Sequence, residues 1–111
     1  MTYHIFTVDN NEYKLRLNTR NIVALEKDLG KNPLYVFVDE ETKKPIAPTT
    51  EESVSILYHS LKALQPEMTL DDAYELFDKW LDEGNIIGDF SAVIVEVYKL
   101  SGIFKKPDEK N

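Results

Sequence analysis

The chain contains no cysteine, only four glycines and one tryptophan, and no apolar run long enough to cross a bilayer. Without cysteine, the protein has no disulfides, no thiolate nucleophile and none of the cysteine-based structural zinc sites. Its stability must therefore come from side-chain packing. The first residues show no basic leader followed by a long apolar stretch, so we expect a protein of the cytoplasm.

An excess of positive charge is also missing, because 20 acidic residues outnumber 13 basic ones and the formal net charge is −7. Proteins that hold nucleic acid or anionic membranes use clustered lysine and arginine, so we expect neither nucleic acid nor membrane as a partner. Negative charge of this size favours solubility and suits a basic or strongly apolar protein partner.

Motifs of catalysis and metal binding are absent as well. His4 and His59 lie far apart and have no His, Cys or Asp at metal-ligand spacing. The acidic residues of 71–75 are explained by the helix macrodipole, which favours carboxylates in a first turn. Those of 39–41 lack the alternating ligands and the glycine of a calcium loop. We therefore expect no enzymatic activity, no cofactor and no metal site.

Alternating residues predict a β-hairpin over about residues 2–17. Asp9-Asn10-Asn11 separates the two halves, and these residue types tolerate the positive φ of a tight turn. Because an isolated hairpin is marginal in water, its apolar face should rest on the helices that follow. Burial of Ile5, Leu15 and Leu17 is expected to attach it there.

Four helices are predicted over about residues 19–29, 50–65, 70–83 and 89–101, each with apolar residues at helical spacing. The expected apolar stripes are Ile22, Leu25 and Leu29; Val54, Leu57, Tyr58, Leu61 and Leu64; Leu70, Ala73, Tyr74, Phe77, Trp80 and Leu81; and Phe90, Val93, Ile94, Val97 and Leu100. The β-branched run at 93–95 also fits a strand, but the caps at both ends favour a helix.

Capping residues set the expected helix boundaries. The first three helices have polar N-terminal caps, and a glycine or proline follows each of the four. The caps are Asn18 or Thr19, Thr49 with Glu52, and Thr69 with Asp72; the stops are Gly30, Pro66, Gly84 and Gly102. The predicted fold is α+β and mostly helical, with the hairpin packed on a small four-helix bundle.

The remaining segments connect these elements. Residues 34–38 fit either a strand or a short helix, since the run is apolar and β-branched but follows Asn32-Pro33. Residues 39–48 are charged and contain two prolines, which predicts an exposed loop. We expect a single compact domain over residues 1–104 and a disordered charged tail over 105–111.

Four aromatic residues stand apart from the expected core and are candidates for binding a partner. Tyr35 and Phe37 precede the exposed loop, Trp80 lies at the margin of its helical stripe, and Phe104 follows the last helical stop. We predict that they form an exposed apolar patch that contacts another protein.

Three runs of the sequence carry a family resemblance. Residues 17–34 read L-N-T-R-N-I-V-A-L-E-K-D-L-G-K-N-P-L, residues 69–84 read T-L-D-D-A-Y-E-L-F-D-K-W-L-D-E-G, and residues 97–104 read V-Y-K-L-S-G-I-F. The chain resembles the small tail assembly chaperones of long-tailed phages and prophages. That resemblance implies a protein of the host cytoplasm that binds the tape measure protein, keeps it soluble, promotes tail tube polymerisation and is absent from the mature virion.

The same resemblance implies a longer form, made by translational frameshifting near Phe104-Lys105-Lys106, that engages the tail tube protein. Self-association through the third or fourth predicted helix is compatible with the pattern. The alternative is a structural head-tail connector or another non-catalytic protein-interaction module, and a connector would persist in the virion.

Overall fold

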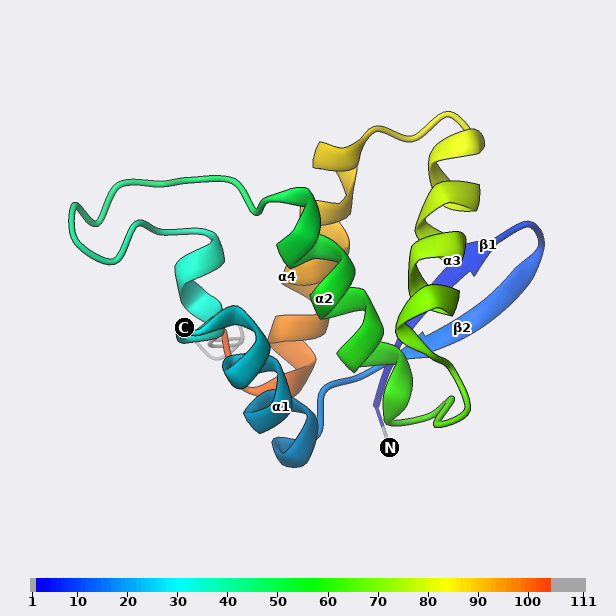
Figure 1. Cartoon of the computed structure of the whole chain (residues 1–111), viewed down its shortest axis with the longest axis horizontal. Helices are drawn as coiled ribbons and strands as arrows, with labels where there is room; N and C mark the ends of the chain where they lie inside the picture. The colour runs from blue at the N-terminus through cyan, green and yellow to red at the C-terminus, as the bar shows by residue number, and fades with distance from the viewer. Residues whose placement is uncertain (1, 105–111) are drawn as a thin grey trace, which may run out of the picture.

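The computed structural model describes residues 2–104, which form a β-hairpin and four α-helices (Figure 1). The predicted α+β, mostly helical fold is confirmed, while the predicted tail 105–111 lies outside the described residues. The elements are β1 (His4–Val8), β2 (Asn11–Leu15), α1 (Thr19–Leu29), the 3₁₀ helix η1 (Pro33–Val36), α2 (Thr50–Lys62), α3 (Leu70–Asp82), the 3₁₀ helix η2 (Ile87–Asp89) and α4 (Phe90–Ser101).

The hairpin turns at Asp9 and Asn10, whose φ angles of 55° and 65° are those of a tight turn matched to strand twist. β1 and β2 pair antiparallel, with Phe6 opposite Tyr13. Phe6 is only 3% exposed, whereas Ile5 is 39% exposed. The expected burial of Ile5 is therefore wrong, because side chains alternate along a strand and the core takes the register of Phe6.

Helix α2 occupies the centre of the molecule. It contacts α1, α3, α4 and β2, and Figure 1 shows α1 and α3 on opposite sides of it. Its burial extends well beyond the predicted stripe, because these neighbours cover several of its faces. The buried residues of α2 are Ser53, Val54, Ile56, Leu57, His59, Ser60 and Leu61.

Two of the predicted N-terminal caps form as expected. Thr49 Oγ1 accepts from the backbone N–H of Glu52 at 3.1 Å, and Glu52 Oε1 accepts in return from Thr49 N–H at 2.9 Å. Thr69 and Asp72 exchange the same pair of bonds at 3.1 and 2.9 Å. The Thr69 N–H holds the pKa of the Asp72 carboxyl below its usual value.

The start of α1 differs in detail from the prediction. Asn18 is the N-cap residue; its backbone N–H donates to Asn21 Oδ1 at 3.1 Å, while its own Oδ1 accepts from Arg16 Nε at 2.7 Å. A guanidinium is a stronger, charge-assisted donor than a backbone amide, which explains why it takes this oxygen. Arg16 also donates to the Thr2 carbonyl at 2.8 Å and so holds the chain entering β1.

Helix α2 ends at Lys62, earlier than the predicted 65, and Gln65 joins it to the hairpin. Gln65 Oε1 accepts from Lys14 N–H at 2.8 Å, and Gln65 Nε2 donates to the Lys14 carbonyl at 2.9 Å. This side chain satisfies the outward backbone groups of β2, as a neighbouring strand would.

For residues 34–38, where the sequence fits a strand or a short helix, the structure shows the short helix. Pro33 opens η1, and Asn32 Oδ1 accepts from Leu34 N–H at 2.9 Å. The chain then turns outward through the predicted loop, which projects from the body of the molecule (Figure 1). An isolated bridge between Val38 and Pro45 closes its base.

Tyr98 fastens α4 to η1. Its side chain is 0% exposed, and its hydroxyl donates to the Pro33 carbonyl at 3.0 Å. Burial, with a smaller contribution from the negative charge of Glu52, raises the pKa of the Tyr98 hydroxyl above its ordinary value. The folded protein therefore holds this proton more tightly than the unfolded chain does.

Truncation of a buried side chain at the centre of α2 should strongly destabilise the protein. Leu57 is 0% exposed, so Leu57→Ala should lower the free energy of unfolding by roughly 2–5 kcal/mol through lost burial and the cavity left behind. Val23→Ala, at a side chain 44% exposed, is the matched control and should stay within about 0.5 kcal/mol. Urea denaturation measures both, and equal losses would contradict a core centred on α2.

Tyr98→Phe should lower stability by about 1–3 kcal/mol, because the Pro33 carbonyl loses its donor. The same substitution should also change how the free energy of unfolding depends on pH. Above the ordinary tyrosine pKa of about 10, the unfolded chain releases this proton while the folded state keeps it, so the unmodified protein loses stability as pH rises. Urea unfolding near pH 8 and near pH 11 should show a smaller alkaline loss in Tyr98→Phe. An unchanged alkaline loss would contradict the assignment.

Candidate partner-binding surface

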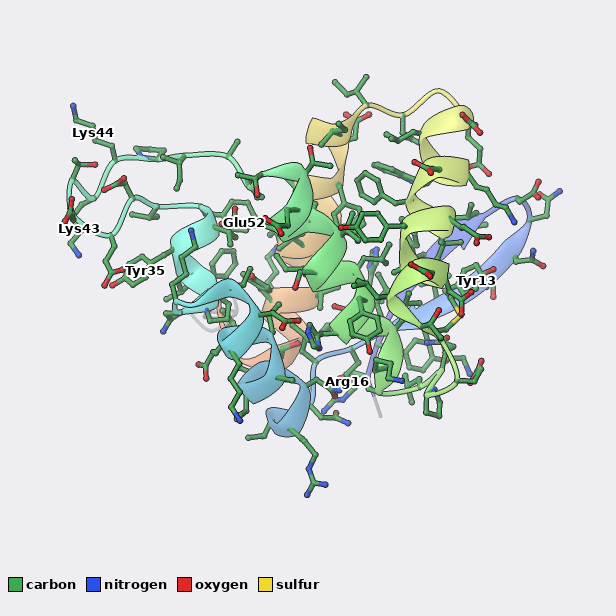
Figure 2. All side chains as sticks on the ribbon, viewed as in Figure 1. Tyr13, Arg16, Tyr35, Lys43, Lys44 and Glu52 are labelled. Carbon is green, nitrogen blue, oxygen red and sulfur yellow. The ribbon has the colours of Figure 1, made fainter. Side chains whose placement is uncertain are left out.

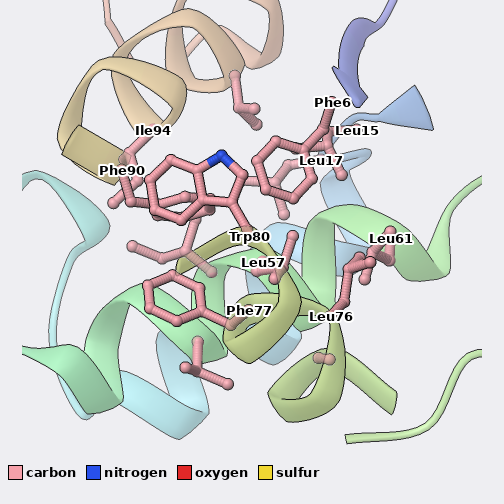
Figure 3. Close-up of a cluster of buried hydrophobic side chains, with 14 of the residues drawn as sticks. Phe6, Leu15, Leu17, Leu57, Leu61, Leu76, Phe77, Trp80, Phe90 and Ile94 are labelled. Atoms are coloured by element: carbon pink, nitrogen blue, oxygen red, sulfur yellow. The ribbon is translucent and has the colours of Figure 1, made fainter. Parts of the chain in front are cut away.

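Trp80 belongs to the core, so the expectation that it lies at an exposed margin is wrong. It is 7% exposed, and its ring lies 5.5 to 5.8 Å from three other aromatic rings (Figure 3). These are the rings of Phe6, Phe77 and Phe90. The inward face of α3 is Ala73, Leu76, Phe77 and Trp80, with helical spacing that places Trp80 within the buried strip.

Phe37 and Phe104 come together, as the predicted patch requires, but both are half-buried. Their ring centroids are 5.8 Å apart and lie 6.0 and 5.3 Å from that of Tyr98. The two rings thus cover the C-terminal part of α4, while contact with a partner stays a prediction.

Tyr35 lies apart from that pair and faces the projecting loop. Its ring centroid is 5.5 Å from Lys43 Nζ, a cation–π contact (Figure 2). The loop itself is ordered by Asp39, whose carboxylate accepts from Thr42 and Glu41 N–H at 2.8 and 2.9 Å. The four predicted contact residues therefore do not form one patch.

A groove that the sequence did not indicate lies where the end of α1 meets the beginnings of α2 and α3. Its volume is about 430 Å³. We call it the α1–α2–α3 groove. Its lining residues are Asp28, Leu29, Thr49, Glu51, Glu52, Ser55, Leu70 and Tyr74.

Two apolar side chains of α3 are exposed in this groove. Leu70 is 46% and Tyr74 is 48% exposed, and they lie one turn apart on the helix. The sequence predicted both within the buried stripe of α3, and that part of the prediction is wrong. The apolar stripe of α3 is wider than the strip that α2 and the hairpin cover, so its outer part remains at the surface.

The rim of the groove is acidic. Glu52 forms an ion pair with Lys31 at 2.8 Å (Figure 2 labels Glu52). Partial burial tends to raise the pKa of the Glu52 carboxyl, but the hydrogen bonds from Lys31 and Thr49 and the lysine charge outweigh it and lower that pKa. Asp28 Oδ2 lies 2.5 Å from His59 Nε2, which ties α1 to α2.

Ser55 adds a polar group to the wall. Its Oγ is buried and has no hydrogen-bond partner among the described residues. Buried hydroxyls normally find a partner, so this oxygen is an exception among the residues that line the groove.

Within 2–104, no group of three or more His, Asp and Glu side chains is placed to hold a metal ion. Asp72, one of the carboxylates considered from sequence, caps α3. No helix in this range combines the length and apolar character needed to span a bilayer.

The geometry defines a small α+β protein in which a hairpin closes a four-helix bundle beside an open acidic groove. A family model matches residues 2–111, and the chain belongs to that family, DUF6096, a family of unknown function. Comparison with curated proteins and with solved structures finds no match.

The burial pattern of α3 makes a direct prediction. Trp80→Ala should lower the free energy of unfolding by roughly 3–5 kcal/mol, because it removes the indole from the aromatic cluster. Tyr74→Ala, on the same helix but exposed, should change it by about 0.5 kcal/mol or less. Paired urea titrations compare the two, and a large loss in Tyr74→Ala would mean that this ring is part of the core.

Proposed function

We propose that this protein is a tail assembly chaperone of a long-tailed phage or prophage. It binds the tape measure protein in the host cytoplasm, keeps it soluble and promotes polymerisation of the tail tube, and it is absent from the mature virion. A longer, frameshifted form that engages the tail tube protein belongs to the same proposal.

The positions of the resembling runs support this proposal. Residues 17–34 form α1 and the start of η1, and residues 69–84 form α3 with its cap. The two runs, far apart in sequence, supply opposite walls of the α1–α2–α3 groove, through Asp28 and Leu29 on one side and Leu70 and Tyr74 on the other. Two of the three motifs that carry the resemblance thus meet at one surface.

The exposed apolar pair within an acidic rim is the observation that carries the function. A chaperone for a long helical client must cover apolar surface on that client and still remain soluble. Leu70 and Tyr74 provide the apolar contact, and the net charge of −7 provides solubility.

Co-expression with the tape measure protein tests the proposal. The candidate client is the long, helix-forming protein encoded immediately downstream. Its soluble fraction should rise in the presence of this chain, and the two should co-purify. Expression of the client alone, and with an unrelated acidic protein of similar size, are the controls. Mass spectrometry of purified particles should not find this chain.

An insoluble client without co-purification would contradict the chaperone function. Detection of this chain in purified particles, at a fixed ratio to the other structural proteins, would instead favour the head-tail connector.

A further inference from the structure

We propose that the α1–α2–α3 groove binds one amphipathic helix of its partner, with the helix's apolar stripe on Leu70 and Tyr74 and flanking lysine or arginine side chains against the acidic rim. This deepens the proposed chaperone function by naming its binding site and the chemistry of the client segment, and it rests on that function for the identity of the partner.

The apolar part of the groove has the spacing that a helix recognises. Leu70 and Tyr74 lie four residues apart, on one side of α3, and Leu29 faces them as a half-buried side chain from the end of α1. An amphipathic helix presents apolar residues at intervals of three and four, so its stripe can lie along such a pair. Burial of these two exposed side chains supplies the driving force.

Acidic side chains predominate beside this pair, because Lys31, which pairs with Glu52 at 2.8 Å, lies outside the groove lining. Asp28 and Glu51 line the groove, and its lining contains no lysine or arginine. At 100° per residue, exposed Asp71, Glu75 and Asp78 form the strip of α3 next to Leu70 and Tyr74, on the side away from the core. A helix with basic residues on both flanks of its apolar stripe therefore meets negative charge on both sides.

The same charges exclude other occupants. A second copy of this chain would bring another acidic rim against the first, and an acidic segment would be repelled in the same way.

Peptide binding to the full chain tests this inference. Two fluorescent peptides of about 18 residues, roughly five helical turns, share one leucine stripe and differ only in flanking residues, lysine in one and glutamate in the other. Fluorescence anisotropy should show binding of the lysine peptide that weakens with added salt, and no binding of the glutamate peptide.

Substitutions test whether the lysine peptide binds in the groove. Tyr74→Ala should lower the affinity for the lysine peptide by roughly tenfold or more. Ile86→Ala, at a side chain 67% exposed outside the groove lining, should leave that affinity unchanged. Glu51→Lys should weaken binding of the lysine peptide and make that binding less dependent on salt. Glu12→Lys, an equal charge change at an exposed position on β2, is the matched control and should have a smaller effect.

Several results would overturn the inference: equal binding of both peptides, no binding of the lysine peptide, or equal losses in Tyr74→Ala and Ile86→Ala. Dimerisation seen by sedimentation and abolished by Tyr74→Ala would assign the groove to a second copy. The two proposals fail separately. A client that stays insoluble while the lysine peptide binds would overturn the chaperone function alone, and a rescued client that binds Tyr74→Ala unchanged would overturn the groove assignment alone.

Discussion

Burial of α2 determines how the other elements of the fold are arranged. Leu57 and Leu61 are 0% exposed because α1, α3, α4 and β2 all pack against this one helix. A central helix has a limited surface, so each neighbour can bury only the strip that faces it. For α3 this leaves Leu70 and Tyr74 outside the core, and the proposed binding surface is a direct consequence of how the core is filled.

The walls of the groove are held by local bonds as well as by packing. The capping box of α2 places Glu52 beside Lys31, which fixes the segment after α1 against the start of α2. The contact between Asp28 and His59 adds a second link between the same helices. Contact residues carried on helices fastened in this way are preorganised, so less free energy is lost to ordering them when a partner binds.

Local features could be predicted from the sequence, as could the packing of the hairpin through Leu15 and Leu17, but the finer tertiary arrangement could not. The caps Thr49 with Glu52 and Thr69 with Asp72 form as expected, because each depends on residues three positions apart. The predicted exposure of Trp80 and the predicted burial of Tyr74 were wrong. Periodicity gives the width of an apolar stripe, but it does not show which part of that stripe a neighbouring element covers. Phe37 and Phe104 are in contact although they lie far apart in the sequence, and the groove joins three helices, so neither arrangement has a signature within a short window.

Site-specific photo-crosslinking in cells that also produce the tape measure protein tests whether this client binds in the α1–α2–α3 groove. A photoreactive phenylalanine analogue replaces Tyr74, Tyr35 or Ile86 in turn, and crosslinks to the client are detected after irradiation. We expect a crosslink from position 74 and none from position 86. A crosslink from position 35 without one from position 74 would contradict it and place the client on the surface beside the projecting loop.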